Sequence, residues 1–214
     1  MKKFTDYAVF DFDGTLVDSM PTWAEKMLRL LRMQNITPPE DLIPIIATLG
    51  DKGTLDYFEK HFTLTMTREQ MLEEMDSYAL PRYASDIPLK EGVKEYLLAL
   101  KKQGVKLYLL TASPHKMFEP ALNRLNISHL FERLYSSDDF GLAKSNPKIY
   151  LELANTLGVK PAEITFFDDN YNAISTAKSA GVKTVAVYDF TGEKDKQKMQ
   201  LISDLYINSF LELL

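Results

Sequence analysis

The sequence contains no cysteine, which excludes disulfides, thiolate metal sites and cysteine nucleophiles. The lack of thiols also favours a reducing cytoplasm as the compartment in which the protein works. Positive charge is not in excess either, because 25 Lys and Arg residues face 30 Asp and Glu residues, a net charge of -5. Such a chain has no overall positive field to attract nucleic acid or anionic lipid, and we expect neither as a partner.

Long apolar runs are also missing. No stretch approaches the roughly 18 apolar residues of a membrane span, so we expect no membrane segment. Lys2, Lys3 and Asp6 make the start of the chain charged, and we expect no signal peptide. What is present is apolar material for a packed core, 45% of the 214 residues.

Short apolar runs alternate with amphipathic segments over most of the chain. The clearest runs are residues 7–10, 106–110, 164–167 and 184–187, with weaker candidates at 134–135 and 205–207. Their nearly continuous apolar character is typical of parallel strands that are covered on both faces. Helical patterns lie between them at residues 91–103, 116–125, 147–157 and 171–180. This alternation predicts an α/β fold with a Rossmann-like parallel sheet.

Residues 15–85 differ from the rest of the chain. They show helical patterns at residues 21–33, 52–61 and 67–80 and no convincing strand. We therefore expect a helical cap domain at 15–85, inserted into an α/β catalytic core formed by residues 1–14 and 86–214. The proline-containing stretches 81–83 and 86–88 predict the linker that returns the chain to the core.

Polar residues directly follow three of the predicted strands. They are Asp11 and Asp13 after the first strand, Thr111-Ala112-Ser113 after the second, and Asp168-Asp169 after the strand at 164–167. Ligands of open parallel sheets bind beyond the carboxyl ends of the strands. We therefore expect all three sets to converge on one crevice.

The chemistry of this crevice follows from its charge. Several carboxylates in one place repel one another unless a cation compensates, and oxygen-only ligands indicate a hard ion such as Mg²⁺, together with a substrate phosphate. Asp11 is placed to attack a phosphoryl group, and Asp13 to protonate the leaving oxygen and then activate water. Thr111 and the backbone N–H groups after it suit a phosphate oxygen. Lys144, just before the helical pattern at 147–157, is the best-placed balancing cation.

Four sequence motifs point to a known family. Asp11-Phe12-Asp13-Gly14-Thr15 resembles the first motif of the haloacid dehalogenase superfamily of phosphohydrolases. Thr111-Ala112-Ser113 resembles its second motif, Lys144-Ser145-Asn146-Pro147 the third, and Asp168-Asp169 the fourth. Their order and spacing are most similar to the subfamily with a helical cap after the first motif, which includes phosphoglycolate phosphatase and β-phosphoglucomutase.

The resemblance implies a role for each motif. It makes Asp11 the nucleophile, Asp13 the general acid and base, and Lys144 the residue that holds the nucleophile and the phosphate. It places Thr111, with Ala112 and Ser113, on the phosphoryl group. It also implies Mg²⁺ bound by Asp11, the main-chain carbonyl of Asp13, and Asp169, with help from Asp168.

The chain departs from the family pattern at two positions. Ser145 follows Lys144 where the family often has proline, so Lys148 stays a second candidate for the lysine role. Asp168 stands where the family often has Glu or Gly, which leaves open whether Asp168 contacts the metal directly or through water.

The leading hypothesis is an Mg²⁺-dependent phosphatase that hydrolyses a small phosphorylated metabolite through an aspartyl-phosphate. The first alternative is a β-phosphoglucomutase-like phosphomutase, although Pro114 stands where that group carries a lysine. The second is a catalytically silent binding or regulatory protein with the same fold, against which the intact acid set argues. Lys52 is our candidate for a cap residue that reaches the substrate, with an ordinary solvated lysine as its alternative. No coiled-coil heptad or symmetric motif indicates an oligomeric state.

Overall fold

The computed structural model describes residues 2–47 and 49–214. Within them six strands form one parallel sheet in the order β3-β2-β1-β4-β5-β6. The strands are β1 (Tyr7–Phe10), β2 (Lys106–Thr111), β3 (Phe131–Ser136), β4 (Ile164–Asp168), β5 (Lys183–Val187) and β6 (Leu205–Ile207). The predicted parallel sheet is confirmed, and so are both weaker strand candidates.

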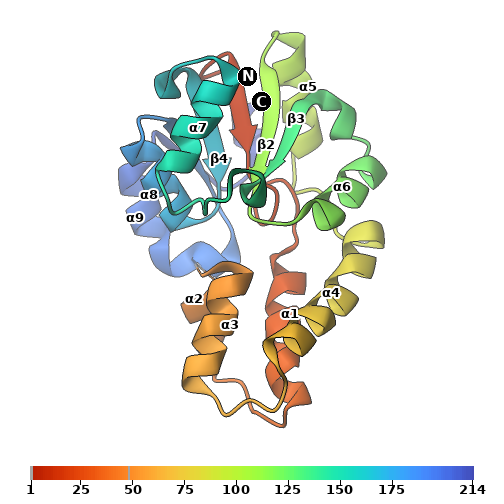
Figure 1. Ribbon diagram of the computed structural model, residues 1–214. Helices are drawn as coiled ribbons and strands as arrows, with labels where there is room; N and C mark the ends of the chain where they lie inside the picture. The colour runs from red at the N-terminus through yellow and green to blue at the C-terminus, as the bar shows by residue number, and fades with distance from the viewer. Residues whose placement is uncertain (1, 48) are drawn as a thin grey trace.

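Helices cover both faces of the sheet, as Figure 1 shows. They are α5 (Val93–Lys102), α6 (His115–Arg124), α7 (Lys148–Leu157), α8 (Tyr171–Ser179) and α9 (Lys196–Ile202), with short 3₁₀ helices η1 (Ser128–Leu130), η2 (Ser137–Phe140), η3 (Pro161–Glu163), η4 (Phe190–Asp195) and η5 (Phe210–Leu213). Apolar residues of α5 and α6 share one buried cluster with β1 and β2, while those of α7 and α8 share another with β4. The sheet is thus buried on both sides, as its apolar strands predict.

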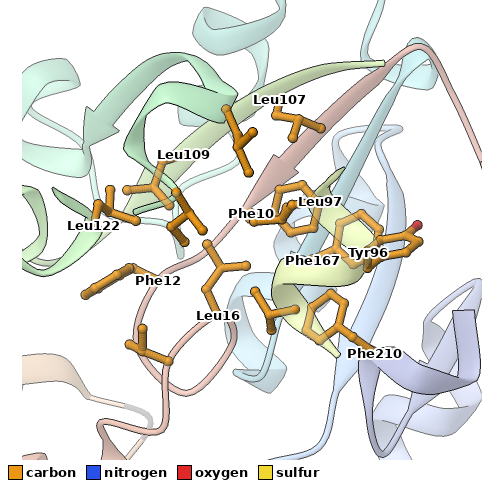
Figure 2. Packing of buried hydrophobic residues seen from close by; sticks show 14 of the residues in the cluster. Phe10, Phe12, Leu16, Tyr96, Leu97, Leu107, Leu109, Leu122, Phe167 and Phe210 are labelled. Carbon is orange, nitrogen blue, oxygen red and sulfur yellow. The ribbon is translucent and has the colours of Figure 1, made fainter. Parts of the chain in front are cut away.

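Aromatic side chains fill the core beneath the carboxyl end of β1 (Figure 2). The rings of Phe10 and Phe167 stack with their centroids 4.4 Å apart. The ring centroids of Phe210 and Tyr96 are 5.7 Å apart. Aromatic pairs of this kind add to the free energy of burial and restrict side-chain freedom. A closely packed aromatic core therefore supports the ends of β1 and β4.

Four further helices lie beyond the carboxyl edge of the sheet, drawn in orange to yellow in Figure 1. They are α1 (Met20–Met33), α2 (Leu42–Ile46), α3 (Gly50–His61) and α4 (Arg68–Ser85). They have a buried core of their own, which includes Met27, Leu31 and Phe58. The three predicted helices in this region are present, whereas α2 was not predicted. The domain boundaries at residues 15 and 85 stay a prediction.

The return path of the chain corrects one prediction. Helix α4 continues through Pro81 to Ser85, so the stretch at 81–83 is helical and not a linker. Pro81 removes one backbone donor, but the helix stays packed because its last turns contact α6 and bury Tyr83. No helix in the two described stretches is long and apolar enough to cross a membrane.

Candidate active site

Three buried carboxylates meet where β1 and β4 end. The two strands pair in parallel, with Phe10 opposite Phe167, and the backbone N–H of Asp11 donates to the Phe167 carbonyl at 2.9 Å. This pairing brings one carboxylate oxygen each from Asp11, Asp168 and Asp169 within 4.8 Å of one another. The three residues are only 4%, 0% and 7% exposed, respectively.

Lys144 is the cation that the structure brings to this cluster. Its Nζ lies 2.7 Å from Asp11 Oδ1 and 2.7 Å from Asp168 Oδ2. Burial by itself lowers a lysine pKa, but the two carboxylates outweigh it and raise the pKa of Lys144. Lys144 therefore stays charged, whereas Lys148 lies exposed on the first turn of α7.

One lysine does not balance three buried carboxylates. Burial, together with the nearby Asp168, raises the pKa of Asp11 to about 7 even though Lys144 acts in the opposite direction. Burial also raises the pKa of Asp169 well above its ordinary value, with Asp168 and Asp189 adding to the effect. A divalent cation would relieve this excess of negative charge, and the all-oxygen donor set fits a hard metal ion.

The two acids of the fourth motif differ in their hydrogen bonds. Asp168 has a partner on each oxygen, because Oδ1 accepts from the Asn170 backbone N–H at 2.7 Å and Oδ2 from Lys144. Asp169 accepts from the Thr15 hydroxyl at 3.0 Å on Oδ1. Asp169 thus keeps more capacity than Asp168 to contact a metal.

Gly14 makes the close approach of Asp169 possible. Its φ is +72°, in the left-handed region, and a Cβ at this position would lie 2.9 Å or less from all three atoms of the Asp169 carboxyl group. Any larger residue would displace that carboxylate. The glycine of the first motif therefore fixes the position of the Asp169 carboxylate in the cluster.

Asp13 points to a different set of partners. Its carboxylate accepts hydrogen bonds from Ser19 Oγ at 2.7 Å, from Ser113 Oγ at 2.5 Å and from the Tyr83 hydroxyl. Burial, and then the nearby Asp13, raises the pKa of Tyr83 well above its ordinary value, so Tyr83 stays a proton donor. Sequence reasoning missed Tyr83, because no local pattern links it to a residue 70 positions away.

The second motif is held at the end of β2. Thr111 is 1% exposed, and its hydroxyl accepts from the Ser113 backbone N–H at 3.1 Å. Ser136 at the end of β3 donates to the Ser113 carbonyl at 3.0 Å. Ala112 is exposed between these two fixed residues. Residues at the ends of β2 and β3 thus position Ser113, whose hydroxyl donates to Asp13.

Lys52 lies at the boundary between the helices of residues 20–85 and the sheet. It is on the first turn of α3, its side chain is 83% exposed, and its Nζ is 3.2 Å from Asp138 Oδ1 on η2. A contact between Lys52 and a substrate stays a prediction.

Comparison with known proteins agrees with the motif pattern. A family model described as haloacid dehalogenase-like hydrolase matches residues 5–181. Hexitol phosphatase B of Escherichia coli K12 is 26% identical over 96% of this chain and 93% of its own length. Phosphoglycolate phosphatase of Pseudomonas putida is 29% identical over 92% of this chain and 75% of its own length.

A solved structure of similar sequence has the same fold. The crystal structure of a predicted phosphoglycolate phosphatase from Haemophilus somnus 129pt has a TM-score of 0.80 and 25% identity, and the match covers 100% of this chain and 98% of that one. The matched residues of the family model include all four motifs. The chain belongs to the haloacid dehalogenase-like hydrolase family.

Proposed function

We propose that this protein is an Mg²⁺-dependent phosphatase that hydrolyses a small-molecule phosphomonoester through an aspartyl-phosphate. The observation that carries the proposal is the buried Asp11, whose Oδ1 lies 2.7 Å from Lys144 Nζ beside two further carboxylates. A second acid, Asp13, follows two residues later. The named relatives are phosphatases, in agreement with this reading.

Each residue has a defined task in the reaction. An Asp11 oxygen attacks phosphorus while the bond from phosphorus to the alcohol oxygen breaks, and Asp13 gives its proton to that leaving oxygen. Asp13 then takes a proton from a water molecule as the water attacks the aspartyl-phosphate, which releases phosphate and regenerates the Asp11 carboxylate. Lys144 holds the attacking carboxylate in place and offsets charge on the phosphoryl oxygens.

Asp11 and Asp169, with the Asp13 main-chain carbonyl, would hold the metal, and Asp168 would support it chiefly by fixing Lys144. When bound there, Mg²⁺ neutralises the phosphate charge and orients the phosphoryl group. Thr111, Ala112 and Ser113 offer a hydroxyl and backbone donors to the remaining phosphoryl oxygens. The helices of residues 20–85 act as the cap that covers the substrate.

The experiment is a release assay with purified protein. We expect Mg²⁺-dependent release of inorganic phosphate from an aryl phosphate and from some members of a panel of phosphorylated metabolites. Asp11→Asn should lower kcat by a factor of roughly 10³ or more, since it removes the nucleophile. Asp56→Asn, an exposed acid on α3, is the matched control and should retain activity. No metal-dependent release above the Asp11→Asn background on any ester would overturn the proposal.

A further inference from the structure

A charged side chain of the cap helices is almost completely buried. Lys26 on α1 is only 4% exposed, and its Nζ donates to Asp51 Oδ2 at 2.8 Å. The indole Nε1 of Trp23 donates to the other oxygen, Asp51 Oδ1, at 2.9 Å. Trp23 and Lys26 thus fix the orientation of the Asp51 carboxylate from two sides.

Trp23 and Lys26 follow Ser19, a contact of Asp13, along α1. Ser19, whose hydroxyl contacts Asp13, immediately precedes α1, and the Trp23 backbone N–H donates to the Ser19 carbonyl at 2.9 Å. Ser19, Trp23 and Lys26 are spaced four and three residues apart, which places them on one helix face. At about 1.5 Å of rise per residue, Trp23 lies roughly 6 Å and Lys26 roughly 10 Å along the axis from Ser19.

Two other contacts place Asp51 at the same boundary. Asp51 is on the first turn of α3, beside Lys52, which reaches Asp138 of the core. Asp51 also adds to the rise in the pKa of Tyr83, after burial and Asp13, and the Tyr83 hydroxyl contacts Asp13. Asp51 therefore lies where the cap helices meet the core, near the residues that surround Asp13, and the proposed reaction places the alcohol part of the ester beside Asp13.

Asp51 is the accessible member of the trio. Its side chain is 36% exposed, against 4% for Lys26, so the surface it offers to a substrate is a carboxylate. A carboxylate oxygen has two acceptor sites, and each Asp51 oxygen has one occupied by Trp23 or Lys26. The free sites are fitted to accept hydrogen bonds from hydroxyl groups and would repel an anion.

We propose that Asp51, held by Trp23 and Lys26, selects substrates whose leaving group is an uncharged polyhydroxy alcohol and disfavours leaving groups that carry a carboxylate. This inference deepens the proposed phosphatase function and rests on it. Asp51 acts as a specificity-determining residue that binds the hydroxyl groups farther from phosphorus.

The test compares three esters: a hexitol phosphate, phosphoglycolate and p-nitrophenyl phosphate. In the wild-type protein we expect kcat/KM for the hexitol phosphate to exceed that for phosphoglycolate. Asp51→Asn should lower kcat/KM for the hexitol phosphate by about tenfold or more, because a hydrogen bond to a charged acceptor is weakened. The same substitution should raise kcat/KM for phosphoglycolate, since like-charge repulsion is removed, and should leave p-nitrophenyl phosphate within about twofold.

Control variants separate selection from folding. Asp56→Asn makes the same change on the same helix, at an acid paired with Arg68 and 68% exposed, and should leave the three values in their original ratio. Because Asp51→Asn leaves the Lys26 charge without its partner, the double variant Lys26→Met/Asp51→Asn removes both charges together. It should show the same loss of hexitol phosphate preference.

The outcomes are distinguishable. Equal changes for all three esters in both Asp51 variants, or a wild-type preference for phosphoglycolate that Asp51→Asn leaves unaltered, would overturn the selectivity inference alone. Absence of metal-dependent release from every ester by the wild-type protein would overturn the proposed phosphatase function, and the inference with it.

Discussion

The Tyr83 hydroxyl is the contact through which α4 reaches Asp13. Two of the three hydroxyl partners of Asp13 lie where the cap helices meet the core, because Ser19 immediately precedes α1 and Tyr83 is near the end of α4. Asp13 is thereby oriented from the first and from the last of the cap helices. Orientation of this kind is a large part of general acid catalysis.

We expect Tyr83→Phe to reduce kcat by roughly tenfold for esters of alkyl alcohols, the equivalent of one hydrogen bond. For p-nitrophenyl phosphate, whose leaving group needs little protonation, the reduction should be less than about threefold. Steady-state kinetics on both esters measures the difference. Tyr78→Phe, on the same helix, is the control, and equal losses on both esters in Tyr83→Phe would show a structural role only.

His115 gives a pH-dependent contact at the start of α6. Its Nδ1 is 2.7 Å from Glu119 Oε1 and its Nε2 is 2.9 Å from Asp139 Oδ2. The hydrogen bond with Glu119, and then that with Asp139, raises the pKa of His115 above 6.5 although partial burial opposes it. The stabilisation by these two acids is therefore fully present below pH 6.5 and is lost as the pH rises through the raised pKa.

An NMR titration of the imidazole protons tests this contact. We expect the pKa of His115 to lie above the ordinary value of 6.5 and to fall in Glu119→Gln, while Glu95→Gln on the exposed face of α5 leaves it unchanged. A midpoint at or below 6.5 in the wild-type protein would contradict the ion pairs seen in the structure.

Residues that sequence reasoning identified and those that it missed differ in the range of their contacts. Asp11, Asp168 and Asp169 were predicted to converge because each follows a recognisable strand, and the structure brings them together. The contacts of Tyr83 and Asp51 depend on how the cap helices pack, and no local pattern records that packing. The catalytic and metal-binding roles of all these residues stay predictions.

At the scale of elements, apolar continuity made the strands predictable, whereas the cap helices were harder to delimit. Helix α2 has five residues and contains Pro44, so it has little periodicity of its own and is fixed by packing of Leu42 and Ile46. The end of α4 was misassigned because Pro81 is a strong breaker signal that tertiary packing overrides. In both cases contacts made by the folded cap outweigh local preference.

One buried glutamine joins α1 to the segment that precedes α4. Gln34 is 7% exposed, and its Oε1 accepts from the backbone N–H groups of Thr65 and Met66 at 2.8 and 2.9 Å. Its Nε2 donates to the Leu30 carbonyl at 3.0 Å. These bonds satisfy donors that the folded cap would otherwise leave without partners.

Gln34→Ala should therefore lower the free energy of unfolding by about 1–3 kcal/mol, because two backbone donors lose their acceptor. Hydrogen exchange should accelerate first at the amides of α1 and α4, with the sheet amides less affected. Gln200→Ala, at an exposed position on α9, is the control and should be neutral. Uniform acceleration over sheet and cap would show that the two parts do not open separately.

At the scale of the whole molecule, the net charge of -5 is modest, but negative charge is concentrated at the ends of β1 and β4. The fold buries three carboxylates beside one lysine. The predicted sheet already implied that the carboxylates meet, since both strands end in acids. The carboxylates repel one another, so a cation bound between them would relieve this repulsion and stabilise the native state. A ligand that binds only the native state stabilises it in proportion to the logarithm of its concentration over Kd.

Mg²⁺ should accordingly raise the melting temperature of the metal-free protein. At 100 times Kd the gain is about 2.7 kcal/mol, which for a chain of this size corresponds to roughly 5–10 °C. Asp169→Asn should lose most of this increase and yet melt no lower than the wild-type protein without metal, because it removes one of the mutually repelling buried charges. Asp56→Asn should keep the full increase. A metal-induced shift of the same size in Asp169→Asn would place the ion elsewhere.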